Sequence, residues 1–362
     1  MLTTSSSQFS ARREQVIPSL HELKAPAFLT TALPNVRYLT GFTGSNGALL
    51  LTTDRALLFT DPRYATQAPQ ESDCEIKIAK GPLLKEVSKW TERLRLKSLA
   101  FEQNRISFED YGQLKEHAKP LRLKPVTGLI ETLRTVKSEG EIAAIRRSVI
   151  LNSTALEQSL RHFKPRMSEI DLAAEIEYRM RRLGAESPAF ETIVASGQRS
   201  ALPHARPTPA RIQTDELLLI DMGATVAGYA SDMTRTHAVG KLDAKRQRLH
   251  QAVLESQLAA LAAIKPGVTC ASVDRVARNV LRGFGLEKQF IHSTGHGLGL
   301  EIHERPRVGR KDKTKLVTGM VITVEPGVYE EGFGGVRIED TVVVTVNGCE
   351  TLTPTRKELL TL

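Results

Sequence analysis

An internal repeat in the second half of the chain constrains the fold more than any other feature of the sequence. Three pieces occur twice, in the same order and about a hundred residues apart. They are a helical pattern opened by a capping residue (Ser168 and Thr269) and ended near glycine (Gly184 and Gly283), a short histidine motif (PHARP at 203–207 and IHERP at 302–306), and an apolar strand (LLLIDMG at 217–223 and VITVEPG at 321–327). The repeat predicts a duplicated helix and strand unit whose two copies face each other across a shared cleft.

Each copy ends in a strand, turn and strand pattern with carboxylates on both arms. Asp221 and Asp232 flank one turn region, and Glu325 and Glu339 flank the other. A carboxylate in a buried, apolar strand is costly unless it is paired, neutralised or bound to a metal. Taken singly, each acid is also compatible with a strand end or the surface. Together with His296, the four form a hard, oxygen-rich set that predicts a site for two divalent cations with bridging ligands.

The first half reads as a separate α/β unit. Strand patterns lie between Ala25 and Ala68, a helical pattern covers residues 82–95, and further signals continue to about Leu129. A long helical region is expected over residues 131–163. We therefore expect an α/β (α+β) protein with two domains, residues 1–130 and 131–362.

The composition limits the kinds of partner and the cellular compartment that we expect for this chain. No apolar run of about 18 residues occurs and the start lacks the apolar core of a secretory signal, so we expect a cytoplasmic protein with no membrane partner. Three scattered cysteines suit a reducing compartment and disfavour a thiolate metal site. The net charge of +9 would suit nucleic acid, but the basic residues are spread along the chain without an RNA-binding signature, so no nucleic-acid partner is expected.

Five motifs in the second half follow one another as SGQRSALPH, DMGATVAGYASDMTRT, GHGLGLEIHERP, EPGVY and GGVRIED. Their order and spacing resemble the pita-bread metallopeptidases, specifically the branch of proline-specific aminopeptidases and prolidases. The strings NVRYLTGFTGSNGALLLT and LLFTDPRYATQA in the first half resemble the creatinase-like domain that accompanies this branch. The resemblance covers nearly the whole chain after about residue 20. It implies a small creatinase-like α/β domain followed by a pita-bread catalytic domain with an internal pseudo-twofold repeat.

The resemblance also implies a ligand set for a dinuclear centre: Asp221, Asp232, His296, Glu325 and Glu339. Asp232 and Glu339 would bridge two divalent metal ions, with manganese favoured and cobalt or zinc as alternatives. Thr234 would orient the Asp232 carboxylate. Glu325 would also carry a proton from the attacking water to the leaving nitrogen.

Four further residues match functional positions of the family. His303 would stay outside the coordination sphere and stabilise the oxyanion formed from the substrate carbonyl, while His204 would line the site. Arg337 would organise the active site and Tyr229 would contact substrate. A surface cation and a partly buried ring are the plain alternatives for the last two.

The implied activity is a metallo-exopeptidase that cleaves the Xaa-Pro bond of proline-containing dipeptides or short peptides. An aminopeptidase must leave room beyond proline, whereas a dipeptidase must bind a free carboxylate. Arg307, four residues after His303, suits a bidentate pair with such a carboxylate, although an exposed loop charge explains it equally well. We favour dipeptidase action, and the family resemblance implies a homodimer.

Three alternatives remain. Creatinase shares both domains but performs metal-free hydrolysis and lacks the full acidic ligand set. A methionine aminopeptidase shares only the catalytic half. A catalytically inactive pita-bread scaffold would be expected to have lost ligands, and this chain keeps all five.

Overall fold

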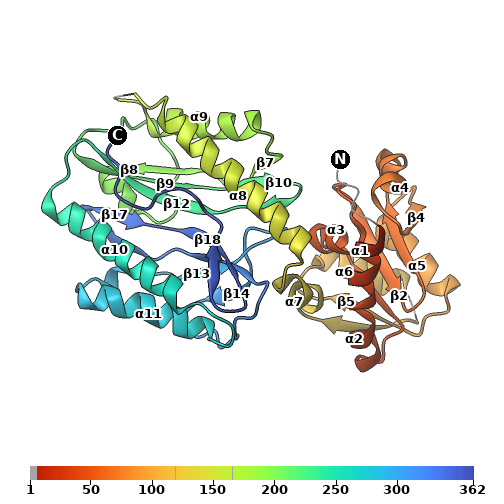
Figure 1. Ribbon diagram of the computed structural model, residues 1–362. Helices are drawn as coiled ribbons and strands as arrows, with labels where there is room; N and C mark the ends of the chain where they lie inside the picture. Colours follow the sequence, from red (N-terminus) through yellow and green to blue (C-terminus); the bar gives the residue numbers. More distant parts are fainter. Residues whose placement is uncertain (1–5, 119, 165) are drawn as a thin grey trace. The chain divides into compact units, whose positions relative to one another are not determined.

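The computed structural model describes residues 6–118, 120–164 and 166–362. Contacts within the chain divide it into two compact units, Met1–Arg134 and Thr135–Leu362. Figure 1 shows that both units combine helices with sheets, as the sequence predicts for a mixed α/β protein.

The first unit is built on one six-stranded sheet. Its strands, in spatial order, are β4 (Glu75–Ile78), β3 (Ala56–Thr60), β2 (Gly47–Thr52), β1 (Ala27–Thr30), β5 (Ser98–Glu102) and β6 (Arg122–Val126). Its helices are α1 (Ser6–Glu14), α2 (Ile17–Glu22), α3 (Leu33–Thr40), η1 (Pro62–Tyr64), α4 (Gln67–Glu71), α5 (Leu83–Arg93), α6 (Phe108–His117) and α7 (Leu129–Thr135). The pairs β1–β2 and β2–β3 are antiparallel, whereas β3–β4, β1–β5 and β5–β6 are parallel.

The helix expected over residues 82–95 is confirmed as α5. Leu84 and Val87 lie one turn apart on its buried face and join a core cluster with Leu50 and Leu57 of the sheet. The long helical region expected over residues 131–163 is confirmed, and it consists of two helices, α7 and α8. Ser138 caps a new helix there, because its hydroxyl and the Glu141 carboxylate each accept the other's backbone N–H, so α7 ends before α8 begins.

The second unit contains four long helices and thirteen short strands among its described residues. The helices are α8 (Glu139–Leu160), α9 (Glu169–Arg182), η2 (Gly197–Ala201), α10 (Ala244–Ala263), α11 (Cys270–Gly283) and η3 (Glu287–Gln289). The strands are β7 (Ser187–Pro188), β8 (Ile193–Ser196), β9 (Glu216–Met222), β10 (Ala224–Val226), β11 (Tyr229–Ala230), β12 (Met233–Val239), β13 (Gly295–Gly297), β14 (Glu304–Val308), β15 (Val321–Val324), β16 (Gly327–Glu330), β17 (Gly334–Arg337), β18 (Asp340–Val344) and β19 (Cys349–Thr351).

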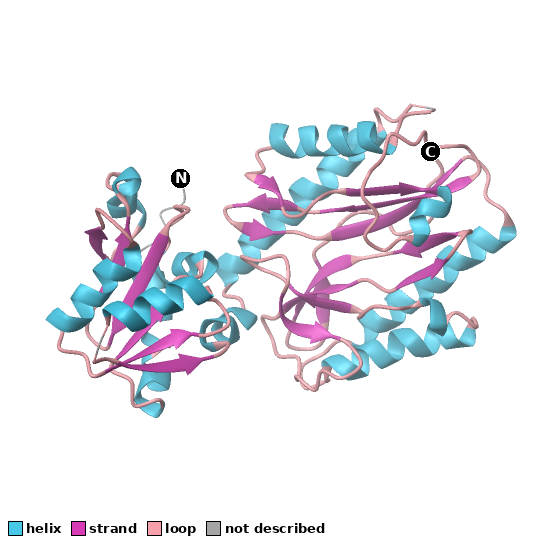
Figure 2. Ribbon diagram, turned by 180° about the vertical axis from the view of Figure 1, so that it is seen from behind, coloured by secondary structure: helices cyan, strands magenta, loops and turns pink. Residues whose placement is uncertain are grey.

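The predicted repeat is visible in how these elements pack. The helix pair α8–α9 shares a core with β9, and the pair α10–α11 shares a second core with β15 and β18. Ser168 caps α9 and Thr269 caps α11, as the sequence predicts. Figures 1 and 2 show the two helix pairs on opposite sides of the strands. The strands of the two copies, β12–β9–β8 and β14–β13–β15–β18–β19, therefore lie between them.

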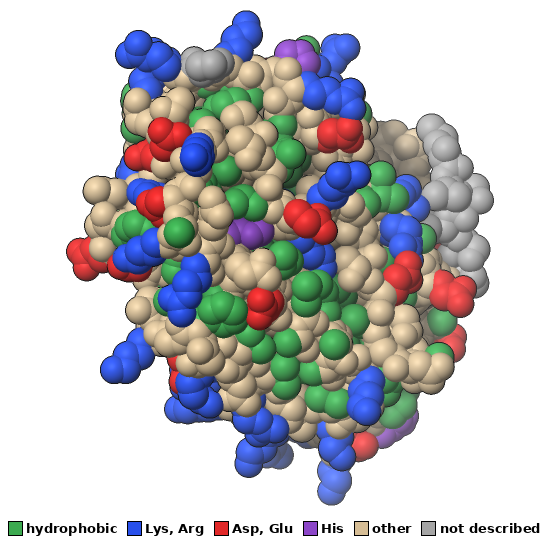
Figure 3. Space-filling view, turned by 60° about the vertical axis from the view of Figure 1, so that its left-hand side comes forward, with side chains coloured by type: hydrophobic (Ala, Val, Ile, Leu, Met, Phe, Trp, Pro, Cys, Tyr) green, Lys and Arg blue, Asp and Glu red, His purple; other side chains and the backbone are tan. Residues whose placement is uncertain are grey.

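The surface is mixed in character. On the face shown in Figure 3, Lys and Arg side chains are scattered among Asp and Glu, and hydrophobic side chains gather across its lower middle. Among the described residues, none of the helices combines the length and apolar character that crossing a membrane requires.

Candidate metal centre

Two antiparallel pairings bring the four carboxylates of the repeat together. The register of β9 with β12 sets Asp221 opposite Thr234, and Asp232 directly precedes β12. The register of β15 with β18 ends with Val324 opposite Asp340, which leaves Glu325 and Glu339 adjacent beyond it.

The two copies are joined at this point by a backbone hydrogen bond. The Glu339 N–H donates to the Thr234 carbonyl oxygen over 3.1 Å, so the strand of one copy lies against the strand of the other. Each copy therefore contributes two carboxylates to the same small volume.

His296 of β13 completes the cluster. One ligand atom from each of Asp232, His296 and Glu339 lies within 4.8 Å of the others. The His296 Nε2 atom is 3.5 Å from Asp232 Oδ2 and 3.5 Å from Glu325 Oε1. Its Nδ1 atom faces the Gly297 carbonyl oxygen at 3.0 Å, an arrangement that puts the proton on Nδ1 and leaves Nε2 free towards the carboxylates.

The electrostatics show how crowded these acids are. Burial, followed by repulsion from Glu339, Asp221 and Glu325, raises the pKa of Asp232 well above its ordinary value. Burial likewise raises the pKa of Glu325 to about 7 and that of Glu339 well above its ordinary value. Asp221 Oδ1 and Glu339 Oε1 are buried and lack a hydrogen-bond partner within the part of the chain that the structure describes. The cluster thus has oxygen atoms that an added cation would satisfy.

Arg337 and Thr234 hold the acids in position. The Arg337 guanidinium donates to Asp221 Oδ2 through Nη2 at 2.6 Å and to the Thr234 hydroxyl through Nε at 3.0 Å. That hydroxyl donates in turn to Glu339 Oε2 at 2.7 Å. The expectation that Thr234 orients Asp232 is therefore wrong: because the two copies meet at Thr234 and Glu339, its hydroxyl reaches the carboxylate of the other copy.

The other predicted histidines lie beside this cluster. The ring of His303 is 4.4 Å from that of His296, centroid to centroid, and belongs to the loop before β14. Partial burial, followed by electrostatic interaction with His296 and His204, lowers the pKa of His303, so these two rings lie within electrostatic reach of His303. His303 and His204 are exposed, so both remain accessible to a bound molecule.

Tyr229 and Arg307 occupy different positions. The Tyr229 hydroxyl donates to Glu141 Oε1 of α8 at 3.1 Å, so its ring is anchored on that helix. Arg307 of β14 pairs directly with His296 of β13 in the antiparallel ladder, and its side chain is exposed.

Sequence reasoning missed two residues of the site, His292 and Tyr329. The His292 Nε2 atom is 2.9 Å from the Tyr329 hydroxyl, which accepts from Arg337 Nη1 at 2.7 Å. Burial lowers the pKa of His292 to about 4, so this ring is neutral at pH 7. The EPGVY motif contains both Gly327 and Tyr329, and a Cβ on Gly327 would lie only 2.6 Å from the Tyr329 hydroxyl.

Comparison with known proteins places the chain in a family. The model of metallopeptidase family M24 matches residues 143–346, and the model of the creatinase/prolidase amino-terminal domain matches residues 12–136. The chain belongs to metallopeptidase family M24. A protein named Xaa-Pro dipeptidase from Pyrococcus horikoshii is 38% identical over 96% of this chain and 98% of that protein.

Solved structures of related enzymes have the same fold. An Xaa-Pro dipeptidase from Bacillus anthracis superposes with a TM-score of 0.95 at 39% identity, covering 98% of this chain and all (100%) of that one. An X-Pro aminopeptidase from Thermotoga maritima gives a TM-score of 0.90 at 36% identity, covering 97% and 100%. These neighbours confirm the creatinase-like and pita-bread architecture that the sequence predicts, and their names divide between dipeptidase and aminopeptidase.

M24 membership makes the chain a metallopeptidase and implies divalent metal ions. The residues present fit such ions. Two buried carboxylates (Asp232 and Glu339), two partly buried ones (Asp221 and Glu325) and a single imidazole form the oxygen-rich donor set that hard divalent cations prefer. Neutralisation by cations is also the simplest way to keep these acids ionised together in a buried place.

Proposed function

We propose that the chain hydrolyses the Xaa-Pro bond of proline-containing dipeptides or short peptides at a dinuclear metal centre. Its ligands would be Asp221, Asp232, His296, Glu325 and Glu339. The convergence of Asp232, Glu325 and Glu339, from both repeat copies, on one histidine carries this proposal. Asp221 joins them through Arg337. The names of the similar enzymes, Xaa-Pro dipeptidase and X-Pro aminopeptidase, supply the choice of substrate.

Bound divalent ions would supply an activated water and polarise the scissile carbonyl. Two residues of the chain would carry out proton transfer and stabilise the oxyanion. Glu325 accepts a proton from the attacking water and delivers it to the leaving proline nitrogen. His303, exposed beside His296, donates a hydrogen bond to the carbonyl oxygen as negative charge develops there, a contact of the kind worth about 3 kcal/mol.

The remaining site residues position substrate and ligands. Arg337 fixes Asp221 and, through Thr234, Glu339, so it sets the spacing of carboxylates from both copies. His204 lines the site on the side of His303. Tyr229 contacts substrate with its ring, since its hydroxyl is held by α8.

The position of Arg307 supports dipeptides over longer peptides as substrates. It lies opposite His296 in the ladder, is exposed, and its guanidinium has no hydrogen-bond or ion-pair partner among residues 6–118, 120–164 and 166–362. A bidentate pair with the free carboxylate of Xaa-Pro would use it. Arg307→Ala should then raise the KM for Ala-Pro by roughly 10-fold to 100-fold, the range for a hydrogen bond to a charged group, and raise it much less for Ala-Pro-Ala. Equal effects on both peptides would reject the clamp.

A proline-release assay tests the whole proposal. Protein stripped by a chelator and resupplied with manganese, cobalt or zinc should regain activity on Ala-Pro, with manganese the best. If no metal restores proline release, the chain is a binding scaffold with a pita-bread fold. We also propose that residues 1–130 and 131–362 are the two domains, that the protein is a cytoplasmic homodimer, and that its molar mass by light scattering is twice that of the chain.

A further inference from the structure

A basic pocket lies beside the candidate metal centre. It is a hollow of about 940 Å³ in the second unit, and six lysines and arginines but only two carboxylates line it. The cations are Arg278, Lys288, Arg307, Arg310, Lys311 and Lys313.

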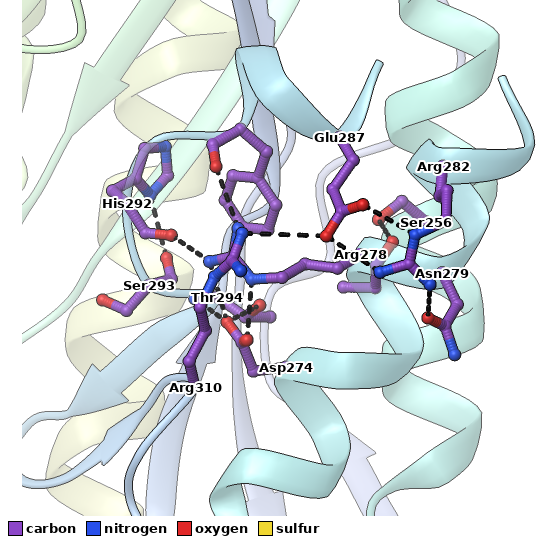
Figure 4. A network of polar contacts seen from close by, with 12 residues as sticks. Ser256, Asp274, Arg278, Asn279, Arg282, Glu287, His292, Ser293, Thr294 and Arg310 are labelled. Carbon is purple, nitrogen blue, oxygen red and sulfur yellow. Dashed lines mark hydrogen bonds and ion pairs between the residues drawn. The ribbon is translucent and has the colours of Figure 1, made fainter. Parts of the chain in front are cut away.

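Arg278 builds the floor of the basic pocket and needs no ligand. It extends from α11 and is only 5% exposed. Figure 4 shows its guanidinium held between the Asp274 carboxylate and the segment that carries His292. The bonds are to Asp274 Oδ2 at 2.7 Å and to the carbonyl oxygens of Phe290, at 2.9 Å, and His292. The floor is therefore fixed in advance, as a binding site requires.

The two carboxylates in the lining are already engaged. Glu287 lies between Arg282, whose Nε atom is 2.7 Å away, and Arg310 at 3.7 Å (Figure 4). Asp312 accepts the backbone N–H groups of Arg307 and Thr314 at 3.1 and 2.8 Å. Two negative charges against six positive ones leave the lining with an excess of positive charge.

Four cations around the basic pocket remain uncompensated. The side chains of Lys288, Arg307, Lys311 and Lys313 are exposed and make no hydrogen bond or ion pair within the described part of the chain. Like charges gathered in one concavity produce a positive potential that attracts an anion. The basic pocket therefore favours a negatively charged group over a neutral one.

Two connections join the basic pocket to the metal centre. Arg307, in its lining, pairs with His296 across β13 and β14. His292, also in its lining, contacts Tyr329, which in turn accepts from Arg337. The basic pocket thus begins one strand away from the ligand cluster, on the side where Arg307 lies.

We propose that the basic pocket binds an acidic residue of the substrate directly after proline. This inference rests on the proposed function, in which the substrate carboxyl end points to Arg307. A dipeptide would end at that guanidinium. In a longer peptide the third residue would continue into the hollow, whose volume far exceeds that of one carboxylate, and Lys311 and Lys313 would face a Glu or Asp side chain there. The enzyme would then select Xaa-Pro-Glu over its neutral counterpart.

The test compares kcat/KM for Ala-Pro-Glu and Ala-Pro-Gln on the metal-loaded enzyme. In low salt we expect kcat/KM for Ala-Pro-Glu to be about fivefold higher than for Ala-Pro-Gln, which is the effect of two exposed ion pairs. In about 0.5 M salt the ratio of the two kcat/KM values should approach one, because salt screens these charges. The double variant Lys311→Ala, Lys313→Ala should lower the low-salt ratio to about one to twofold. Lys265→Ala, an exposed lysine of the same unit outside the lining, should leave the ratio unchanged.

The outcomes separate the two proposals. Equal kcat/KM for the two tripeptides would refute the proposed role of the basic pocket and leave the proposed function intact. Cleavage of Ala-Pro with neither tripeptide cleaved would have the same meaning. If no peptide is hydrolysed, the proposed function fails, and calorimetric binding of the two tripeptides decides on the pocket. Tighter binding of Ala-Pro-Glu, lost in the double lysine variant, would support it, whereas equal binding would refute it.

Discussion

The Thr234 hydroxyl offers a sharp test of the metal centre, because it touches a proposed ligand without being one. It donates to Glu339 Oε2 at 2.7 Å and accepts from Arg337 Nε at 3.0 Å, and the residue is fully buried (0% exposed). Thr234→Val keeps the shape of the side chain and removes both bonds. We expect the variant to fold and to bind divalent metal more weakly.

The expected magnitude follows from the state of Glu339. Burial raises the pKa of its carboxyl well above the ordinary value, and the hydrogen bond from Thr234 opposes that rise by stabilising the ionised form. Without the hydroxyl, protons compete better with metal for this carboxylate. Removing a group that supports a metal ligand typically lowers affinity by about 10-fold to 100-fold, or roughly 1.4 to 2.7 kcal/mol. The loss should grow as the pH falls, since more Glu339 is then protonated.

Thr236→Val is the matched control. Thr236 lies two residues along β12, is buried, and bonds the Arg337 backbone, donating to its carbonyl oxygen at 3.0 Å and accepting from its N–H at 3.2 Å. Both variants should lose about 1 to 2 kcal/mol of unfolding free energy, measured by denaturant titration. Calorimetric manganese titration at pH 6 and pH 8 should show weakened binding only for Thr234→Val. Equal metal affinities in the two variants would refute the assignment of Glu339 as a ligand.

Three further predictions concern stability. Removal of metal by a chelator should lower the thermal unfolding temperature more at pH 8 than at pH 5.5. The reason is that the pKa of Glu325 is raised to about 7, so its ionisation at pH 8 adds repulsion among the metal-free acids. An equal loss at both pH values would contradict this. Lys137→Met should cost about 3 to 5 kcal/mol, because it removes the cation paired with Glu304, 3.1 Å away, and both side chains of this pair are buried (1% and 6% exposed). A loss under about 1 kcal/mol would count against this reasoning. Burial raises the pKa of Glu102 to about 7. Its contribution to the unfolding free energy is therefore full below its unfolded pKa of about 4.5 and is lost as the pH rises through 7. Glu102→Gln should remove this pH dependence, and an unchanged pH profile of the unfolding free energy would argue against the assignment.

Much of the architecture was predictable because it depends on local signals. The repeat was readable since both copies use the same capped helix and the same apolar strand, and periodicity reports burial directly. The capping box at Ser138, however, lay within a continuous helical pattern. Whether the helix continues or restarts at Ser138 depends on whether the Ser138 side chain caps a new helix. The spacing of apolar residues gives no information on this.

The sequence predicted that the acids and His296 would come together, but not the contacts around them. Acids that interrupt apolar strands stand out, because burial makes each one costly. The contacts around them depend on which backbones meet, so the partner of Thr234 proved to be Glu339 and not Asp232. His292 and Tyr329 carry no charge at pH 7, and their importance arises only from the bond between them.

The backbone contact between Thr234 and Glu339 has a consequence for the molecule's mechanics. Each half of the duplication supplies a strand and two acids at this junction, so ions bound by the proposed ligands would link the two halves of the second unit. Any motion that separates the halves would then have to break bonds between ligands and ions, and metal binding should rigidify the interior of the unit more than its periphery.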